Sequence, residues 1–305
     1  MGTFKIEGGH KLKGTLTPQG AKNEALQILA AVLLSPLKIT LKNIPEIRDI
    51  LRMIELLKGL GVKVEKLGKG EYTFQSDEIN LDYFHTEEFR TKGAAIRGSI
   101  MIIGPLLARF GIGYIPSPGG DKIGRRRLDT HFIGFENLGA EFIYNKDTGF
   151  YKVEAKNLKG SYMLLEEASV TGTANILMAA SMAEGTTTIY NAACEPYLQQ
   201  LSRMINSMGG KILGIGSNLL TIEGVKELHG CEHTILPDMI EIGSFISLAA
   251  LTQSEITIEN CRVDQLGIIP NVYRKLGVQF EIKDDNIIIP ENKHYEIDSF
   301  IDGSM

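Results

Sequence analysis

The residues with the clearest potential for chemistry form one short stretch, 119–127, with the sequence GGDKIGRRR. Its glycines allow a bound anion to approach the backbone closely, and its three arginines can neutralise that anion. Asp121 lies between the first two glycines and the arginines, and its carboxyl group can carry a proton. This composition is typical of a catalytic loop that handles phosphate, although a solvated surface turn with a run of charges would contain the same residues.

Composition limits the classes of protein to consider. The chain has 305 residues, of which 43% are hydrophobic and 23% charged, which suits a globular enzyme of two domains. Its formal net charge of -5 argues against a nucleic-acid partner, because such a protein needs a basic face that displaces counterions. The run of arginines therefore suits a small anion better.

The cysteines and the apolar segments bear on cofactors and location. Cys194, Cys231 and Cys261 lie far apart without metal-binding spacing, so we expect reduced thiols in or near the core, and no metal or other cofactor. The first residues carry charges where an export signal would be apolar. The longest apolar runs, at 28–34 and 100–108, are about half as long as a bilayer span. We expect a soluble cytoplasmic protein that does not need a membrane.

The chain repeats one pattern four times, at intervals of roughly 70 to 80 residues. Each copy contains a Leu or Met, a Gly and a small residue, at 60–62, 138–140, 208–210 and 276–278. We expect the glycines to end helices in the left-handed conformation. Four units of similar length therefore account for nearly the whole chain.

Each unit has the same predicted order of elements. An almost entirely apolar helix comes first, at 23–34, 96–110, 171–183 and 242–252. A short strand follows, at 38–41, 112–115, 186–190 and 255–258. An amphipathic helix and two further strands complete the unit, such as 62–65 with 72–75, or 278–282 with 286–289. Helices that are apolar on all sides belong inside, so we expect an α/β fold with the sheets outside.

Several motifs connect this pattern to a known family. The first apolar helix opens with QGAKNEAL at 19–26. Six further segments are equally distinctive: IRGS at 96–99, GPLLARFG at 104–111, the loop at 119–131, AEGTT at 183–187, NAA at 191–193 with EP at 195–196, and LPD at 236–238 with Glu241. Together they resemble the enolpyruvyl transferases, most closely the members that act on UDP-N-acetylglucosamine. The resemblance covers essentially the whole chain.

The resemblance implies the enolpyruvyl-transferase fold, an inside-out α/β barrel of repeated units around buried helices. In this family two domains of three units each enclose the active site between them. The first domain would span residues 20–234 and include a catalytic loop at 116–127. Residues 1–19 and 235–305 would form a partial second domain with about one of its three repeats.

The implied reaction transfers an enolpyruvyl group from phosphoenolpyruvate to the 3'-hydroxyl of UDP-N-acetylglucosamine and releases phosphate. It is the first committed step of peptidoglycan synthesis, which serves cell shape and division. Lys22, Arg97 and Arg126 occupy the family's positions for binding phosphoenolpyruvate. Asn23 would hold the sugar hydroxyl and the tetrahedral intermediate, and Lys22 would act beside it. Arg125 and Arg127 are interpreted as neighbours without a role of their own.

The nucleotide sugar would contact three segments and the two arginines Arg97 and Arg126. These segments contribute Asp129, Thr130 and His131, then Ser169, Val170 and Thr171, and finally Asp238 and Glu241. Short polar segments before helices are equally common as helix caps, so this alternative stays open. Glu167 stands where many relatives carry a lysine, which affects the contacts expected for the diphosphate.

Asp121 is the most informative departure from the family. Its commonest members have a cysteine at this position, which donates a proton to the substrate methylene carbon and is alkylated by fosfomycin. A protonated carboxyl group can transfer the same proton but lacks the nucleophilicity of a thiolate toward an epoxide. We therefore expect turnover together with resistance to fosfomycin.

Relative to the family, the chain is expected to be C-terminally incomplete, with little or no turnover by itself. The general base and the last anion-binding arginine cannot be assigned, and a monomer is favoured. One alternative is the related transferase that acts on shikimate 3-phosphate, although its start is rich in Lys and Ser. The other is a non-catalytic protein that binds a nucleotide sugar.

Overall fold

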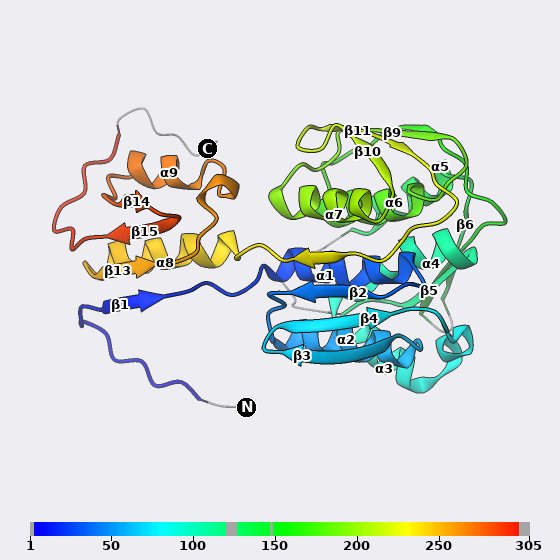
Figure 1. Ribbon diagram of the computed structural model, residues 1–305, viewed down its shortest axis with the longest axis horizontal. Coiled ribbons are helices and arrows are strands. Elements are labelled where there is room, and N and C mark those ends of the chain that lie inside the picture. The colour runs from blue at the N-terminus through cyan, green and yellow to red at the C-terminus, as the bar shows by residue number, and fades with distance from the viewer. Residues whose placement is uncertain (1–2, 120–126, 147–148, 299–305) are drawn as a thin grey trace. The chain divides into compact units, whose positions relative to one another are not determined.

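The computed structural model describes residues 3–119, 127–146 and 149–298, and the chain divides into two compact units (Figure 1). The larger unit is Lys22–Ile235, and the smaller unit combines Met1–Ala21 with Leu236–Met305. Asp121 and Arg126 lie outside the described residues.

Three helices form the centre of the larger unit: α1 (Lys22–Ala31), α4 (Ile103–Phe110) and α6 (Val170–Ala180). Most of their side chains are buried, as the apolar sequences predict. A 3-10 turn, η1 (Val32–Leu34), continues α1. These helices pack against one another, so their apolar surfaces do not face water.

The predicted helix at 96–110 is in fact two segments. Its first part is the 3-10 helix η3 (Arg97–Ile102), and α4 begins only at Ile103. Pro105 has no N–H to donate to the carbonyl four residues earlier, so a regular α-helix cannot form through this turn. The single helix expected from hydrophobicity is therefore wrong at this point.

The amphipathic helices surround this centre. In α2 (Arg48–Gly59), Ile50, Met53, Ile54 and Leu57 are buried, which confirms the predicted apolar face. The remaining helices of the larger unit are α3 (Glu87–Ala94), α5 (Asp129–Asn137), α7 (Pro196–Ser207) and the 3-10 helix η2 (Leu81–His85).

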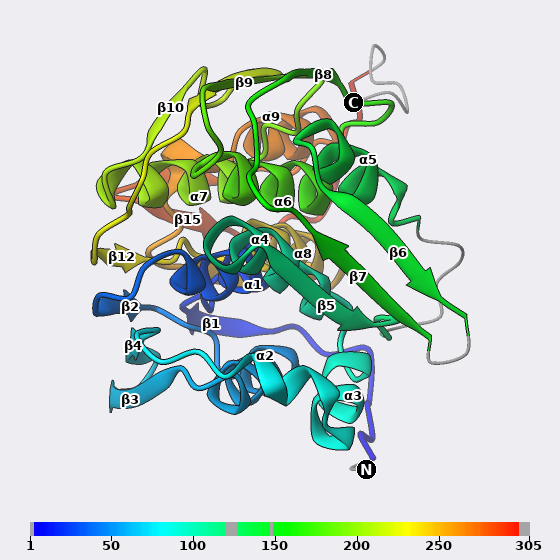
Figure 2. The same cartoon turned by 90° about the vertical axis from the view of Figure 1, so that its right-hand side faces the viewer.

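In the described part of the larger unit, three sheets lie outside the central helices (Figures 1 and 2). The first has the order β12-β2-β4-β3, with β12 (Glu232–Thr234), β2 (Ile39–Lys42), β4 (Glu71–Gln75) and β3 (Lys63–Gly68). The second is β5 (Ile112–Pro116), β7 (Phe150–Glu154) and β6 (Glu141–Asn145). The third is β10 (Lys211–Leu213), β11 (Leu219–Glu223), β9 (Thr186–Tyr190) and β8 (Tyr162–Leu164). Neighbouring strands are antiparallel except for β12 with β2 and β8 with β9.

The smaller unit has one sheet, of order β1-β13-β15-β14, packed against helix α8 (Met239–Leu251). Its strands are β1 (Lys13–Leu16), β13 (Glu255–Ile258), β15 (Asn286–Ile289) and β14 (Glu281–Lys283), and its other helices are η4 (Val263–Gln265) and α9 (Ile269–Lys275). The N-terminal β1 pairs in parallel with β13. Strand β14 begins later than the predicted 278–282, because the Val278 N–H donates at 3.0 Å to the Tyr273 carbonyl in the turn that ends α9.

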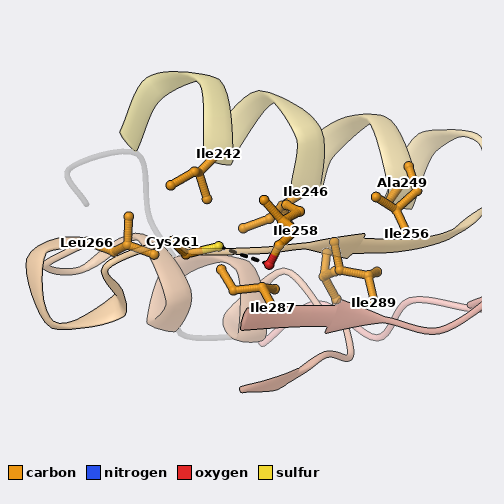
Figure 3. Close-up of a cluster of buried hydrophobic side chains, with 10 residues drawn as sticks. Ile242, Ile246, Ala249, Ile256, Ile258, Cys261, Leu266, Ile287 and Ile289 are labelled. Atoms are coloured by element: carbon orange, nitrogen blue, oxygen red, sulfur yellow. Dashed lines mark hydrogen bonds between the residues drawn. The ribbon is translucent and has the colours of Figure 1, made fainter. Parts of the chain in front are cut away.

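Figure 3 shows the core of the smaller unit, in which Ile242, Ile246 and Ala249 of α8 face the isoleucines of β13 and β15. The Cys261 thiol donates to the Ile258 carbonyl at 3.2 Å, and burial raises the pKa of this thiol to about 11. The opposite side of α8 carries Leu251, which is 85% exposed. Cys231 is half-buried, whereas Cys194 is exposed, so Cys194 does not belong to the core.

The repeated glycines take the predicted conformation. Gly61, Gly139, Gly209 and Gly277 each follow a helix and have φ values of 95°, 89°, 97° and 83°. Other residues rarely adopt this left-handed conformation, which explains why glycine recurs in every unit. The repeat in the sequence is therefore a repeat of backbone geometry.

A second recurring position is occupied by asparagine. Asn43 follows β2 and Asn191 follows β9, and both have left-handed backbones, with φ of 58° and 59°. Each side-chain amide donates at 2.9 Å to a carbonyl just after the parallel edge strand, Ile235 in one sheet and Leu165 in the other. These asparagines hold β12 and β8 in place.

Within the described ranges, no single helix is long and apolar enough to cross a membrane. The bent pair formed by Glu87–Ala94 and Arg97–Phe110 meets the length and composition of a span, with an angle of 115° between its parts.

Candidate functional site

The larger unit contains a pocket of about 800 Å³. Its walls include the first residues of α1, α2 and η3 and the residues on either side of the start of α6. Helix starts leave N–H groups without intrahelical partners and carry the positive end of the helix dipole. The fold therefore produces a pocket whose backbone already favours anions.

The side chains of the pocket reinforce this preference. Among the described lining residues, five are cationic: Lys22, Arg48, Arg52, Arg97 and Arg127. Two carboxylates, Asp49 and Glu167, partly offset them. The excess of positive charge suits a ligand with more than one anionic group.

Lys22 and Asn23, both predicted from the sequence, lie together at the start of α1 and line this pocket. The Lys22 ammonium lies 2.7 Å from the carboxylate of Asp49 on α2. This ion pair is partly exposed, so an incoming anion can reach Lys22 from the pocket.

Arg97, also predicted, is the first residue of η3 and lines the pocket. Its guanidinium donates to the carbonyl of Arg127 at 3.3 Å. This bond connects η3 to the segment before α5. Arg97 can therefore bind a ligand and the Arg127 carbonyl at the same time, since a guanidinium has several N–H donors.

Three cationic lining residues were missed by the sequence interpretation. Arg48 and Arg52 lie on the first predicted amphipathic helix, where charges are expected on the face toward solvent, and Arg127 is interpreted above as a neighbour without a role. Arg52 donates to the Ala95 carbonyl at 3.2 Å, which holds it against the short connection between α3 and η3. Only the spacing of charges near the start of α2 could have pointed to Arg48 and Arg52.

Ser169 fits both interpretations that the sequence left open, a helix cap and a position beside a ligand. The Ser169 hydroxyl caps α6 by accepting a hydrogen bond from the Gly172 N–H at 3.3 Å. Ser169 and Thr171 also line the pocket, while Val170 is absent from its described lining. A helix cap and a ligand contact are compatible here because the helix start forms the wall.

Asp129 and Thr130 line a second pocket, of about 210 Å³, which shares Arg127 and Glu167 with the first. Asp129 forms an ion pair with Arg127, and this hydrogen bond raises the pKa of the Arg127 guanidinium. The Thr130 hydroxyl donates to Glu167 at 3.2 Å. A ligand with a central anion could therefore extend from one pocket into the other.

His131 occupies a different environment from its two predicted partners. Its side chain is only 1% exposed and is absent from the described lining of both pockets. Burial, and secondarily the charge of Arg97, lowers the pKa of this imidazole to about 3. His131 is therefore neutral near pH 7 and lies behind the pocket wall.

Asp238 and Glu241 belong to the smaller unit, at the start of α8. Asp238 caps this helix by accepting from the Ile240 N–H at 2.9 Å, and Glu241 accepts from the Gln19 N–H at 2.7 Å. Their predicted contact with a nucleotide sugar stays a prediction. So do the roles of Asp121 and Arg126, which lie outside the described residues.

Within the residues that the structure describes, no three His, Cys, Asp or Glu side chains are grouped so that they could hold a metal ion. The described lining instead offers cations and hydroxyl groups, which bind an anionic ligand directly.

Comparison with known proteins gives consistent similarities. The family model described as EPSP synthase (3-phosphoshikimate 1-carboxyvinyltransferase) matches residues 6–301. A UDP-N-acetylglucosamine 1-carboxyvinyltransferase from Bacteroides thetaiotaomicron is 59% identical over 305 residues, which are 100% of this chain and 70% of that protein. The enzyme of the same name from Porphyromonas gingivalis is 56% identical over 305 residues, which are again 100% of this chain and 70% of that protein.

Among solved structures, the enolpyruvyl transferase NikO from Streptomyces tendae superposes with a TM-score of 0.81. The match covers 94% of this chain and 68% of NikO, at 18% identity. At this identity the similarity concerns the fold, and it confirms the fold class expected from the repeats.

Proposed function

Since this chain belongs to the EPSP synthase family and is a carboxyvinyl transferase, we propose that it transfers the enolpyruvyl group of phosphoenolpyruvate to the 3'-hydroxyl of UDP-N-acetylglucosamine. The observation that carries this proposal is the pocket of about 800 Å³ at the helix starts, whose described lining includes five cationic side chains. The choice of acceptor is supported by relatives at 56% and 59% identity that bear this activity in their names.

Phosphoenolpyruvate has a carboxylate and a phosphate, and therefore needs several cations in a small volume. Lys22 at the start of α1 and Arg97 at the start of η3 would supply two of them, with Arg126 as the third. Arg48 and Arg52 would add to the positive potential without direct contact. Asn23, next to Lys22, would orient the sugar hydroxyl.

The reaction is an addition followed by an elimination. The 3'-oxygen bonds to C2 of phosphoenolpyruvate, loses its proton to a base, and the methylene carbon C3 gains a proton. The tetrahedral intermediate then loses a proton from C3 and expels phosphate, which restores the double bond. Cations fixed around the phosphate stabilise the charge on the leaving group.

Asp121 would give the proton to C3 in the first step. As a carboxylic acid it would work by general acid catalysis and then recover its proton in the elimination. It would not open the fosfomycin epoxide, because a carboxylate is a weaker nucleophile than a thiolate. Resistance to fosfomycin follows from this proposal.

The nucleotide part of the acceptor would extend into the second pocket, past Arg127. Asp129 and Thr130 would lie beside the uridine, and Ser169 and Thr171 beside the diphosphate. We also propose that Asp238 and Glu241 contact the nucleotide sugar. The product would enter peptidoglycan synthesis in the cytoplasm, with a monomer as the working form.

A phosphate-release assay on the natively expressed protein tests the proposal. Phosphoenolpyruvate with UDP-N-acetylglucosamine should release phosphate, and Lys22→Ala should abolish the release. Phosphoenolpyruvate with shikimate 3-phosphate should release none. If phosphate is released only when shikimate 3-phosphate is the acceptor, the chain belongs to the other branch of the family. If the protein binds the nucleotide sugar but releases phosphate with neither acceptor, a non-catalytic protein is favoured.

A further inference from the structure

A buried amide behind the pocket joins three segments of the larger unit. Asn175 on α6 is fully buried, and its Oδ1 accepts from the Gly104 N–H of α4 at 2.7 Å. Its Nδ2 donates to the Ile100 carbonyl of η3 at 2.9 Å and lies 3.0 Å from His131 Nδ1 on α5. The side chain thus bridges the break between η3 and α4.

These contacts fix the orientation of the Asn175 amide. A backbone N–H needs an acceptor, so the atom near Gly104 must be the oxygen, and a carbonyl needs a donor, so the atom near Ile100 must be the nitrogen. The NH₂ group has two protons, and the second points to His131. His131 Nδ1 must therefore accept, which places the imidazole proton on Nε2.

The tautomer of His131 determines whether the Thr171 hydroxyl accepts or donates in the hydrogen bond between them. His131 Nε2 lies 3.2 Å from the Thr171 hydroxyl oxygen, and as an N–H it donates to that oxygen. The Thr171 hydroxyl then keeps its own proton for another acceptor. Thr171 is exposed and lines the cationic pocket, so that acceptor can be a ligand.

The packing leaves little freedom to rearrange. A Cβ at Gly104 would lie 2.5 Å from Asn175 Oδ1 and 2.4 Å from the Asn175 carbonyl, so α4 approaches α6 closely only because this residue is glycine. Gly172 likewise allows Thr130 to approach α6, since a Cβ there would lie 2.8 Å from Thr130 Cγ2. These close contacts hold α4 and Thr130 against α6, while the Gly104 N–H and the Ile100 carbonyl fix which amide atom accepts and which donates.

We propose that Asn175 and His131 are positioning residues that commit the Thr171 hydroxyl to donate a hydrogen bond to an anionic phosphate oxygen in the pocket. This inference rests on the proposed function, since the diphosphate of a nucleotide sugar is the ligand that supplies this oxygen. His131 thereby acts through Thr171 and does not touch substrate. The arrangement favours phosphate oxygens, which only accept, over ligand groups that only donate.

Two threonine variants test the donor. Thr171→Val should weaken UDP binding about tenfold or more in calorimetry, because a hydrogen bond to a charged group is lost, whereas Thr171→Ser should stay within about threefold. In kinetics, Thr171→Val should raise KM for UDP-N-acetylglucosamine at nearly constant kcat, as expected for lost ground-state binding. Thr188→Val on β9, outside the pocket lining, is the matched control and should change nothing.

Two histidine variants test the positioning role. His131→Gln retains a donor and an acceptor and should bind UDP within about threefold of the parent, while His131→Leu should show the loss seen for Thr171→Val. If folded His131→Leu binds UDP like the parent, the positioning role is wrong. If the parent protein does not bind UDP at all, the proposed function is wrong instead.

The tautomer can be measured without any ligand. In ¹⁵N NMR of the whole protein at pH 7, the His131 resonances, assigned by their loss in His131→Gln, should show a protonated Nε2 and an unprotonated Nδ1. A proton on Nδ1, or on both nitrogens, would overturn the proposal whatever the variants do.

Discussion

The Lys22 ammonium lies 2.7 Å from the Asp49 carboxylate, and both side chains line the cationic pocket. Lys22 is the first residue of α1 and Asp49 the second residue of α2, so the pair joins two helix starts. An anion that binds Lys22 competes with this carboxylate, whose charge also lowers the positive potential of the pocket. Asp49 therefore limits how strongly the pocket attracts anions.

We expect Asp49→Asn to tighten phosphoenolpyruvate binding by about two- to fivefold, because a partly exposed ion pair contributes up to about 1 kcal/mol. Calorimetric titration measures the affinity. Glu55→Gln is the control, since it removes the partner of Lys58 on the same helix, outside the described pocket lining. Weaker binding by Asp49→Asn would mean that Asp49 supports Lys22 and does not compete with the ligand.

Arg97→Lys should raise KM for phosphoenolpyruvate by about tenfold, although the charge is kept. Lysine lacks the planar fork that can bind a carboxylate or phosphate with two hydrogen bonds, and its shorter reach loses the bond to the Arg127 carbonyl. Steady-state kinetics give the result. Arg203→Lys on the exposed face of α7 should leave KM unchanged, and an unchanged KM for Arg97→Lys would remove this arginine from the binding site.

Stability should depend on pH through His131, whose pKa is lowered to about 3 by burial. Below pH 6.5 the unfolded chain binds a proton at this imidazole that the folded protein does not, so stability is full above pH 6.5 and falls as the pH decreases toward 3. Between pH 6.5 and 5 the loss should be about 2 kcal/mol. Urea unfolding of the parent and of His131→Gln should show a steeper pH dependence for the parent, and equal slopes would contradict the assignment.

Replacement of Asp121 by cysteine should preserve turnover and make the enzyme sensitive to fosfomycin. Asp121→Asn should be nearly inactive, since an amide cannot give the proton to C3. Time-dependent inactivation and intact mass after exposure to fosfomycin measure the outcome. Covalent modification of the parent protein at this residue would refute the predicted resistance.

Ile246→Ala should destabilise the smaller unit by about 2–5 kcal/mol, because it leaves a cavity between α8 and the sheet. Ile246 is fully buried in the core drawn in Figure 3. Hydrogen exchange at the amides of β13 and β15 reports on this unit separately. Leu251→Ala, at an 85% exposed position on the same helix, should change exchange little, and equal effects would mean that Leu251 is covered in solution.

Much of the local structure followed from the pattern of residues. Strands β9 and β13 have the predicted bounds, and the glycines after the helices have the predicted conformation. These features depend on neighbours in the chain, so periodicity and turn chemistry are sufficient. The break before Ile103 was missed because hydrophobicity does not report the missing N–H of Pro105.

The short edge strands β12 and β8 were not predicted either. Each has only three residues and is held by a parallel neighbour and by the asparagine after that neighbour, Asn43 or Asn191. Three residues carry too little periodicity to be recognised. Their conformation is set by partners distant in sequence, which only the folded chain supplies.

The sequence by itself determined the family and the repeated unit, and it predicted Lys22, Asn23 and Arg97 as site residues, because motifs and periodicity are local. Only the tertiary structure decided that Arg48, Arg52 and Arg127 join them, and that His131 lies behind the wall while Thr171 faces the pocket. The same residue types occur on exposed helix faces and in caps. Whether a side chain reaches a site depends on which helix starts the fold brings together, and that is a property of packing between segments distant in the chain.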